Sequence, residues 1–367
     1  MNALRGWIKR RVLARVAAHN DARRAQLGQQ RGLSPAHWDA SVADGRLVIG
    51  GCDTVSLARQ FGTPLYVVDA ARLRRDCQAF VGAFRARYPH VELGYSYKTN
   101  PLPGALRVLH EAGALAEVIS HYELWLALDL GVAPRDIIFN GPAKTAEAID
   151  LAVSRGVRLI NVDGLDEVEA VAAAAQRHGV VQPVGVRVVT SVGWQAQFGL
   201  RLHNGEAREA FERIRAWPQL HPCALHVHLG TGIKDIPLYL QAIREMLEFA
   251  RALQRDTGIA IRCFDFGGGF GVPTVQPLDA WDARLGLNGH PTRPVEVDKA
   301  PRIEQYAESI CALVRQYYPE ASLPTLAFEP GRAVSSSAQS LLLQVLAVKH
   351  GRDGITRVIL NGGKNYT

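Results

Sequence analysis

The chain has 367 residues and a mass of 40.1 kDa, which is too long for one small core and suits a large barrel domain with additional parts. Hydrophobic residues make up 47% and charged residues 21%, and this composition excludes a disordered or collagen-like protein. The five cysteines are far apart and form no CxxC pair, so we expect neither a disulfide framework nor a zinc cluster and predict a cytoplasmic protein. No long uninterrupted apolar run occurs, so no membrane-spanning helix is expected.

The net charge of +7 is concentrated at the beginning of the chain. Residues 1–38 contain eight Lys or Arg and one acidic residue, which leaves equal numbers of basic and acidic residues in the remainder. Nucleic-acid binding is therefore not expected. Apolar residues of this N-terminal arm recur at the spacing of an amphipathic helix, namely Leu4, Trp7, Ile8, Val12, Leu13 and Val16. We expect the helix to pack on its own protein; contact with an anionic membrane or a partner protein and an organellar targeting role are the alternatives.

After the arm, residues 45–57 are strand-like, and from Pro64 onward short apolar runs alternate with longer segments of helical spacing. The runs predicted as strands are 65–68, 91–97, 115–119, 137–139, 159–161, 184–189, 224–228 and 261–266. The predicted helices include 71–87, 145–155, 166–177, 205–216 and 238–256. This alternation predicts an α/β fold, a (β/α)8 TIM barrel. A doubly wound sheet is the rival, but its glycine-rich loop would follow the first strand, whereas here it follows the eighth.

The remainder of the chain contains a Pro/Gly-rich segment at 273–301, a helix near 302–318, and strands near Leu326, 341–348 and 356–360. We assign the late strands and 45–57 to a second, β-rich domain. The predicted domains are the basic arm (1–38), the N-terminal part of the β-domain (39–60), the barrel (61–320) and the start of the C-terminal β-domain (321–367).

Reactive groups of barrel enzymes lie where strands end at the carboxyl face, and Lys98 ends the second predicted strand. Partial burial there should lower the pKa of Lys98 and make its amine nucleophilic, as a Schiff-base lysine requires. The alternative is an ordinary strand-end lysine that faces water.

His228 ends the seventh predicted strand, in the sequence Leu225-His-Val-His-Leu-Gly-Thr-Gly232. His226 and His228 share a face by alternation, so a metal-binding pair is one alternative, although no third ligand is evident. A hydrogen-bonded core histidine is another. The glycines that follow suit a close approach of the backbone to a phosphate.

Three consecutive glycines, Gly267, Gly268 and Gly269, follow the eighth predicted strand. Such a run lets backbone N–H groups converge on phosphate oxygens, although a tight turn is the alternative. The spacing is not GxGxxG and no Walker lysine follows, so dinucleotide and nucleoside-triphosphate sites are not favoured.

Glu329-Pro-Gly-Arg332 ends the next strand. A carboxylate and an arginine across this turn could bind a cationic ring nitrogen and an anionic group together, or form a surface salt bridge.

Taken together and in this order, the four motifs resemble those of the fold-type III pyridoxal-phosphate decarboxylases, the family of diaminopimelate, ornithine and arginine decarboxylases. The resemblance runs from about Phe61 to Thr367. Phe61-Gly-Thr-Pro-Leu-Tyr66 is similar to the family's entry into its first barrel strand, and Ser120 and Glu123 match its Ser-x-x-Glu.

The resemblance implies pyridoxal 5'-phosphate as the cofactor and an alanine racemase-like barrel. Lys98 would form the internal aldimine, His228 would stack on the pyridine ring and Glu329 would pair with the ring nitrogen, so these are the predicted catalytic residues. The residues predicted to bind the rest of the cofactor are Gly230, Thr231, Gly267, Gly268, Gly269, Pro330, Gly331 and Arg332. Arg332 is also the predicted substrate-binding residue, and no metal is expected.

The sequence departs from the family's pattern in three places. Gln197 stands where many members have Lys, after a short loop that contains Trp194, and Glu117 stands where several members have Asp. The sequence also ends where the family's C-terminal β-domain begins, without the segment expected to bring a cysteine and a tyrosine to a partner's active site. We therefore expect a homodimer or a partner that completes this domain.

The expected function is α-decarboxylation of an amino acid or diamino acid, as in diaminopimelate decarboxylase. An amino-acid racemase is an alternative, but Glu329 favours decarboxylation because a carboxylate keeps the ring nitrogen protonated, whereas alanine racemase-like enzymes place an arginine there. A cofactor-binding subunit or pseudoenzyme that needs a partner for turnover is the other alternative.

Overall fold

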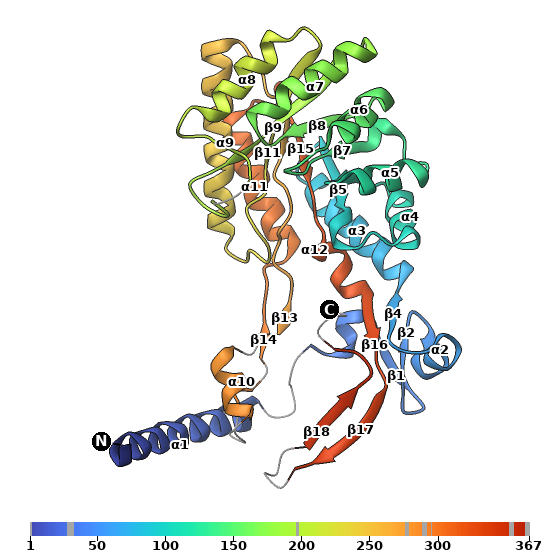
Figure 1. Cartoon of the computed structure of the whole chain (residues 1–367), viewed down its shortest axis with the longest axis vertical. Coiled ribbons are helices and arrows are strands. Elements are labelled where there is room, and N and C mark those ends of the chain that lie inside the picture. The colour runs from blue at the N-terminus through green and yellow to red at the C-terminus, as the bar shows by residue number, and fades with distance from the viewer. Residues whose placement is uncertain are drawn as a thin grey trace. The chain divides into compact units, whose positions relative to one another are not determined.

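The computed structural model describes residues 2–27, 33–195, 198–275, 279–287, 292–294, 296–351 and 356–363. The chain divides into two compact units (Figure 1). The first unit consists of Met1–Asp69, Pro273–Ala300 and Gln339–Thr367, and the second consists of Ala70–Val272 and Pro301–Ala338.

The second unit is a closed (β/α)8 barrel, as the sequence predicts. Among the described residues, its eight parallel strands are β5 (Val91–Ser96), β6 (Leu115–Val118), β7 (Ile137–Phe139), β8 (Leu159–Val162), β9 (Gln182–Val189), β11 (Leu220–Val227), β12 (Cys263–Asp265) and β15 (Thr325–Phe328). Pairing of β8 with β9 closes the circle, and the short β10 (Leu200–Arg201) lies along β9. The helices of this unit are α3 (Ala70–Arg85), α4 (Pro103–Glu111), α5 (His121–Asp129), α6 (Ala146–Arg155), α7 (Leu165–His178), α8 (Glu206–Ala216), α9 (Ile236–Thr257), α11 (Ile303–Tyr317) and α12 (Arg332–Ser335).

Local sequence signals explain why the predicted and observed elements of the barrel agree closely. Every residue of β7 and β8 is buried, as expected for parallel strands that are covered on both faces. Helix α6 begins after Thr145, whose side chain accepts a hydrogen bond from Ala148 N, and ends at Gly156 in the left-handed conformation.

The predicted first barrel strand is wrong. Residues 65–68 do form a strand, β4 (Leu65–Val68), but it pairs with β16 (Gln339–Leu342) in an antiparallel sheet of the first unit. The barrel is completed instead by β15, which lies between β12 and β5. Each motif therefore follows a strand one place earlier in the barrel than expected, and Glu329 follows the eighth.

This topology also differs from the expected domain ranges. The barrel unit begins at Ala70 rather than 61 and continues to Ala338 rather than 320, while Pro273–Ala300 belongs to the first unit. The difference at the end of the barrel arises because β15 pairs on both sides with barrel strands.

The first unit contains small sheets and helices. Its other elements are α1 (Asn2–Leu27), β1 (Ser41–Ala43), β2 (Arg46–Ile49), β3 (Cys52–Asp53), α2 (Thr54–Phe61), β13 (Thr274–Val275), α10 (Ala280–Leu287), β14 (Val297–Asp298), β17 (Val345–His350) and β18 (Thr356–Leu360). The expected strand-like stretch 45–57 is only partly extended, because Asp53 accepts a hydrogen bond from Val55 N and begins helix α2.

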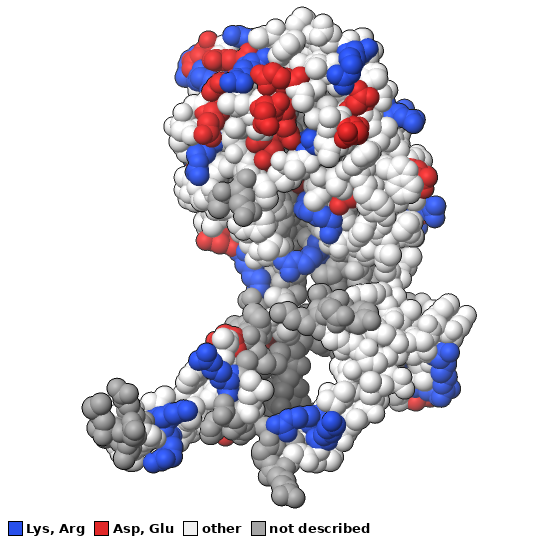
Figure 2. All heavy atoms as spheres, viewed as in Figure 1, with Lys and Arg blue, Asp and Glu red and all other residues white. Residues whose placement is uncertain are grey.

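The basic arm forms helix α1 and contacts its own unit near its C-terminal end. Arg23 forms an ion pair with Glu296 at 2.8 Å, and Asn20 is buried. Trp7, Ile8 and Val12, however, are each about half-exposed, so the expected packing of the arm's apolar face is not seen at these positions. No helix in the described part of the chain is long and apolar enough to cross a membrane. On the face of the barrel unit shown in Figure 2, acidic and basic side chains are interspersed.

Candidate active site

The four sequence motifs meet at the carboxyl ends of barrel strands. Lys98 lies in the turn after β5, His228 follows β11, the three glycines follow β12 and Glu329 follows β15. A cavity of about 470 Å³ is lined by Lys98, Gly230, Thr231, His228, Gly269, Glu329, Gly331 and Arg332 together with Glu117, Asn140, Arg187 and Trp194. The remaining predicted residues, Gly267, Gly268 and Pro330, do not line it. The structure therefore brings most of the predicted set to one cavity.

Lys98 forms an ion pair with a carboxylate from the neighbouring strand. Its Nζ lies 3.0 Å from Glu117 Oε2, and the Glu117 side chain is fully buried. Burial lowers the pKa of Lys98, but the charges of Glu117 and Glu329 raise it by more, so the pKa lies above its ordinary value. The expectation of a lowered pKa for Lys98 is therefore wrong. The carboxylates that raise this pKa come from other strands, Glu117 from β6 and Glu329 from the end of β15.

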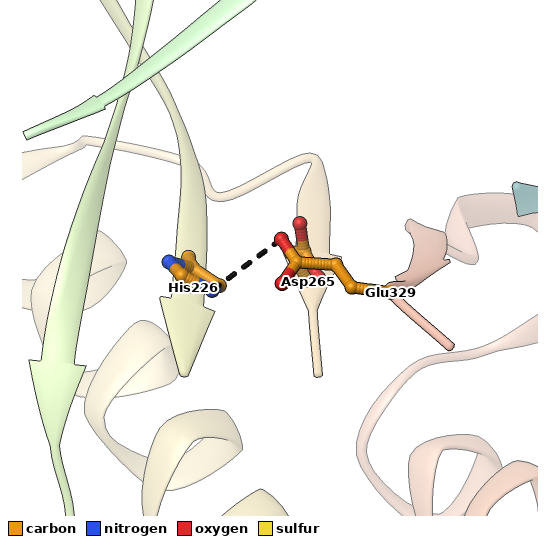
Figure 3. A group of neighbouring side chains, drawn as sticks. All are labelled: His226, Asp265 and Glu329. Atoms are coloured by element: carbon orange, nitrogen blue, oxygen red, sulfur yellow. Dashed lines mark ion pairs between the residues drawn. The ribbon is translucent and has the colours of Figure 1, made fainter. Parts of the chain in front are cut away.

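Glu329 is a buried carboxylate surrounded by polar groups. It accepts a hydrogen bond from Asn140 Nδ2, and its Oε1 lies 3.5 Å from His226 Nε2 (Figure 3). Burial alone raises the pKa of Glu329, but His226, Lys98 and a hydrogen bond with Asp265 lower it below its usual range. Burial and the charge of Glu329 raise the pKa of Asp265 well above its ordinary value, so the two neighbouring acids differ in opposite directions from an exposed carboxylate.

His228 presents a neutral ring to the cavity. Burial lowers its pKa to about 4, and the Trp194 ring meets it edge-on with the ring centroids 5.6 Å apart. Within the described part of the chain, its buried Nδ1 has no hydrogen-bond partner. His226 and His228 are not grouped as the metal-binding pair that the sequence suggested as an alternative. Instead, His226 lies beside Asp265 and Glu329, and the ligand atoms of these three residues lie within 4.8 Å of one another.

The glycine run permits a close approach of three backbone segments. A Cβ added to Gly267 would lie 2.2 Å from Val227 O, and one added to Gly268 would lie 2.2 Å from Glu329 O. Gly267 also has a φ of +64°, a backbone conformation that residues with a side chain rarely adopt. Beside this run, Arg332 Nη2 donates to Thr231 Oγ1 at 2.6 Å. The backbone turn, the hydroxyl and the guanidinium together form a site for an anionic group.

Sequence reasoning missed three buried polar residues of the site: Asn140, Asn161 and Asp265. Asn161 Nδ2 donates to Asn140 Oδ1 at 2.7 Å, and Asn140 in turn donates to Glu117 and Glu329. The sequence does contain a signal for these residues. Each of them interrupts or ends an apolar run of a parallel strand, where a polar side chain needs a hydrogen-bond partner.

Comparison with known proteins gives the class to which this barrel and cavity belong. Residues 71–336 match the family described as "Pyridoxal-dependent decarboxylase, pyridoxal binding domain". The chain therefore belongs to the pyridoxal-dependent decarboxylases, as its motifs predict. It is an enzyme of the carboxy-lyase class that uses pyridoxal phosphate, and the racemase alternative is not favoured.

Among individual relatives, the chain is similar to diaminopimelate decarboxylases. It is 30% identical to that of Methanothermobacter thermautotrophicus over 85% of this chain and 70% of the relative. It is 32% identical to that of Actinosynnema pretiosum over 84% of this chain and 66% of the relative. A crystal structure of the Methanocaldococcus jannaschii enzyme in co-complex with L-lysine matches with a TM-score of 0.80 and 26% identity, over 90% of this chain and 74% of that one.

The donor set of the cavity fits the cofactor. The primary amine of Lys98 suits the aldehyde, and the buried anion Glu329 suits the ring nitrogen. The uncharged ring of His228 suits the face of the cofactor ring, and the anion site at Arg332 suits the phosphate.

Proposed function

We propose that this chain catalyses the α-decarboxylation of a diamino acid of the diaminopimelate type in the 470 Å³ cavity. The observation that carries the proposal is the presence of a buried, ionised Glu329 in the same cavity as Lys98 and the Arg332 anion site. A carboxylate, rather than an arginine, at the ring nitrogen favours decarboxylation.

Each residue of the site has a proposed role. Lys98 would hold the cofactor covalently, and His228 would lie against the face of its ring. The phosphate would be held by Gly230, Thr231, Gly331 and Arg332, supported by the turn of the glycine run and Pro330.

When bound, the cofactor supplies an electron sink for the pair of electrons that remains when the carboxylate leaves as CO2. Glu329 holds a proton at the ring nitrogen, and this task needs a group that stays anionic when buried. His226 and Lys98 keep it so, because they lower the pKa of Glu329 despite its burial. His228, with its pKa lowered to about 4, adds no competing positive charge at neutral pH. Glu117 holds the proton of Lys98 through their 3.0 Å contact.

The substrate assignment is supported by the named relatives and by the walls of the cavity. Diaminopimelate carries a second charged group at its far end, and Arg187 lines the cavity while paired with Asp163 at 3.2 Å. Arg332, the substrate-binding residue expected from the sequence, lines it as well. Trp194 lies in the altered loop and lines the cavity beside His228. Gln197, the other departure in this loop, lies outside the described residues.

The working form is proposed to be a cytoplasmic homodimer. Val345, Leu346 and Val348 on β17 are each more than half-exposed, which supports an interface on the first unit. The five free cysteines suit a reducing compartment. Light scattering of the purified chain should give twice the chain mass.

The test of function is a CO2-release assay of the purified chain with pyridoxal phosphate. We expect turnover of meso-diaminopimelate well above that of lysine, ornithine or arginine, and no turnover by Lys98→Ala. Covalently attached cofactor in Lys98→Ala, or racemisation of the substrate without CO2 release, would contradict the proposal.

A further inference from the structure

Asn140 lies between two buried carboxylates of the cavity. Its side-chain amide donates one hydrogen bond to Glu117 Oε1 at 3.0 Å and another to Glu329 Oε1. The exposed fractions of Asn140, Glu117 and Glu329 are 2%, 0% and 3%. Because so little of either carboxylate is exposed to water, the amide supplies hydrogen bonds that each anion needs.

Asn161 contacts the oxygen side of the Asn140 amide. Asn161 is part of β8, and its Nδ2 donates to Asn140 Oδ1 at 2.7 Å. Since the oxygen of Asn140 is engaged in this way, its NH2 group points to Glu117 and Glu329. The reverse orientation would set its oxygen against two carboxylates and its NH2 against another donor.

The shared amide links the two ends of the site. Glu117 pairs with Lys98, whereas Glu329 lies 3.5 Å from His226. Besides Lys98, the titratable and charged groups around the two carboxylates are Glu123, Arg187, His226, His228, Tyr239 and Asp265. Two carboxylates so close in a buried site repel each other unless a donor lies between them.

We propose that Asn140 is a positioning residue that keeps Glu117 and Glu329 as a pair of anions, one for Lys98 and one for the ring nitrogen. The inference rests on the proposed function, which gives Glu329 its place at that nitrogen. Without the amide, Glu117 and Glu329 lose the hydrogen-bond donor that lies between them. Hydrogen bonds to a carboxylate favour its charged form, so the negative charge that faces Lys98 then decreases.

The test compares Asn140→Leu, which is similar in size but has no donor, with a matched control, Gln182→Leu. Gln182 is also a buried barrel amide, but it begins β9 and donates only to backbone oxygens. In the apoprotein, the pH dependence of attachment of pyridoxal phosphate to Lys98 is measured by borohydride trapping and mass spectrometry. In the holoenzyme, kcat and kcat/KM are measured against pH.

We expect Asn140→Leu to lower the midpoint pH of Lys98 attachment by about one unit or more, because hydrogen bonds to a charged group favour the charged form. The acid limb of kcat/KM should move to higher pH by a similar amount, with kcat more affected than KM. Gln182→Leu should lower thermal stability but leave both pH values unchanged, since its amide donates to backbone oxygens and not to Glu117 or Glu329.

Wild-type pH values in folded Asn140→Leu would overturn the inference. If that variant does not fold, two milder ones replace it. Asn140→Ser keeps one donor, and Asn161→Leu keeps Asn140 but frees its orientation. Both should give smaller shifts in the same direction, and wild-type values in both would equally overturn the inference. A wild-type protein that neither attaches cofactor at Lys98 nor releases CO2 removes the proposed function as well, whereas attachment with unshifted variants removes only the role of Asn140.

Discussion

Replacing Glu329 with Gln removes a negative charge from the site at nearly constant shape. The side chain is 3% exposed, and Glu329 is an anion because His226 and Lys98 lower its pKa by more than burial raises it. A glutamine can still accept the hydrogen bond from Asn140 through its amide oxygen. It cannot, however, hold a proton at the ring nitrogen through a negative charge.

The expected cost is that of losing one preorganised electrostatic partner in a buried site. Such a loss raises the barrier by about 2–4 kcal/mol, which corresponds to a fall in turnover of roughly 30- to 1,000-fold. Cofactor affinity should fall much less, because the anion site formed by Arg332 and Thr231 is unchanged.

The assay is CO2 release under single-turnover conditions, with bound cofactor measured in parallel by its visible absorbance. Glu92→Gln is the matched control, because Glu92 lies near the start of β5, pairs with Arg158 and does not line the cavity. Its turnover should remain near that of the wild type. Wild-type turnover by Glu329→Gln, or an equal loss in Glu92→Gln, would refute the assignment of Glu329 to the ring nitrogen.

Three further predictions concern stability and the cofactor site. Lys144 has a fully buried side chain that pairs with Glu167 at 2.8 Å, so Lys144→Met should lower the free energy of unfolding in urea by about 3–5 kcal/mol, and a loss below about 1 kcal/mol would contradict the burial argument. Gly268→Ala should weaken cofactor binding because its Cβ would lie 2.2 Å from a backbone oxygen, whereas Gly82→Ala, with no atom within 4 Å, should leave binding unchanged in an absorbance titration. Burial lowers the pKa of His228 from 6.5 to about 4, so as the pH falls the unfolded chain is protonated at this residue before the folded protein is. The free energy of unfolding should therefore fall by about 3 kcal/mol between pH 6.5 and pH 4. His228→Phe should lose that part of the pH dependence in urea unfolding measured at several pH values.

Local patterns were sufficient to predict most of the barrel. The apolar runs at 137–139 and 159–161 and the helix at 145–155 differ by no more than one residue from β7, β8 and α6. Period and capping are properties of neighbouring residues, so the sequence displays them directly.

Pairing between distant segments could not be read in the same way. Leu65–Val68 has the composition of a buried strand, yet its partner is Gln339–Leu342, far along the chain. The pKa of Lys98 was mispredicted for a related reason. Burial can be inferred from the apolar run that precedes Lys98, but the carboxylates that reverse the shift, Glu117 and Glu329, come from other strands.

The displaced strand nevertheless left the predicted cavity intact, and the reason lies in the geometry of parallel barrels. All eight strands direct their carboxyl ends to one face, so a residue that follows any of them reaches that face whatever the strand's number. Lys98 and Glu329 follow β5 and β15, which are adjacent in the barrel although more than two hundred residues separate them in sequence. The chemistry of the site therefore depends on which residue follows each strand. The order of strands decides only which pairs can touch, and this is why Asn140, which follows β7, connects with Glu117 on β6 and Asn161 on β8.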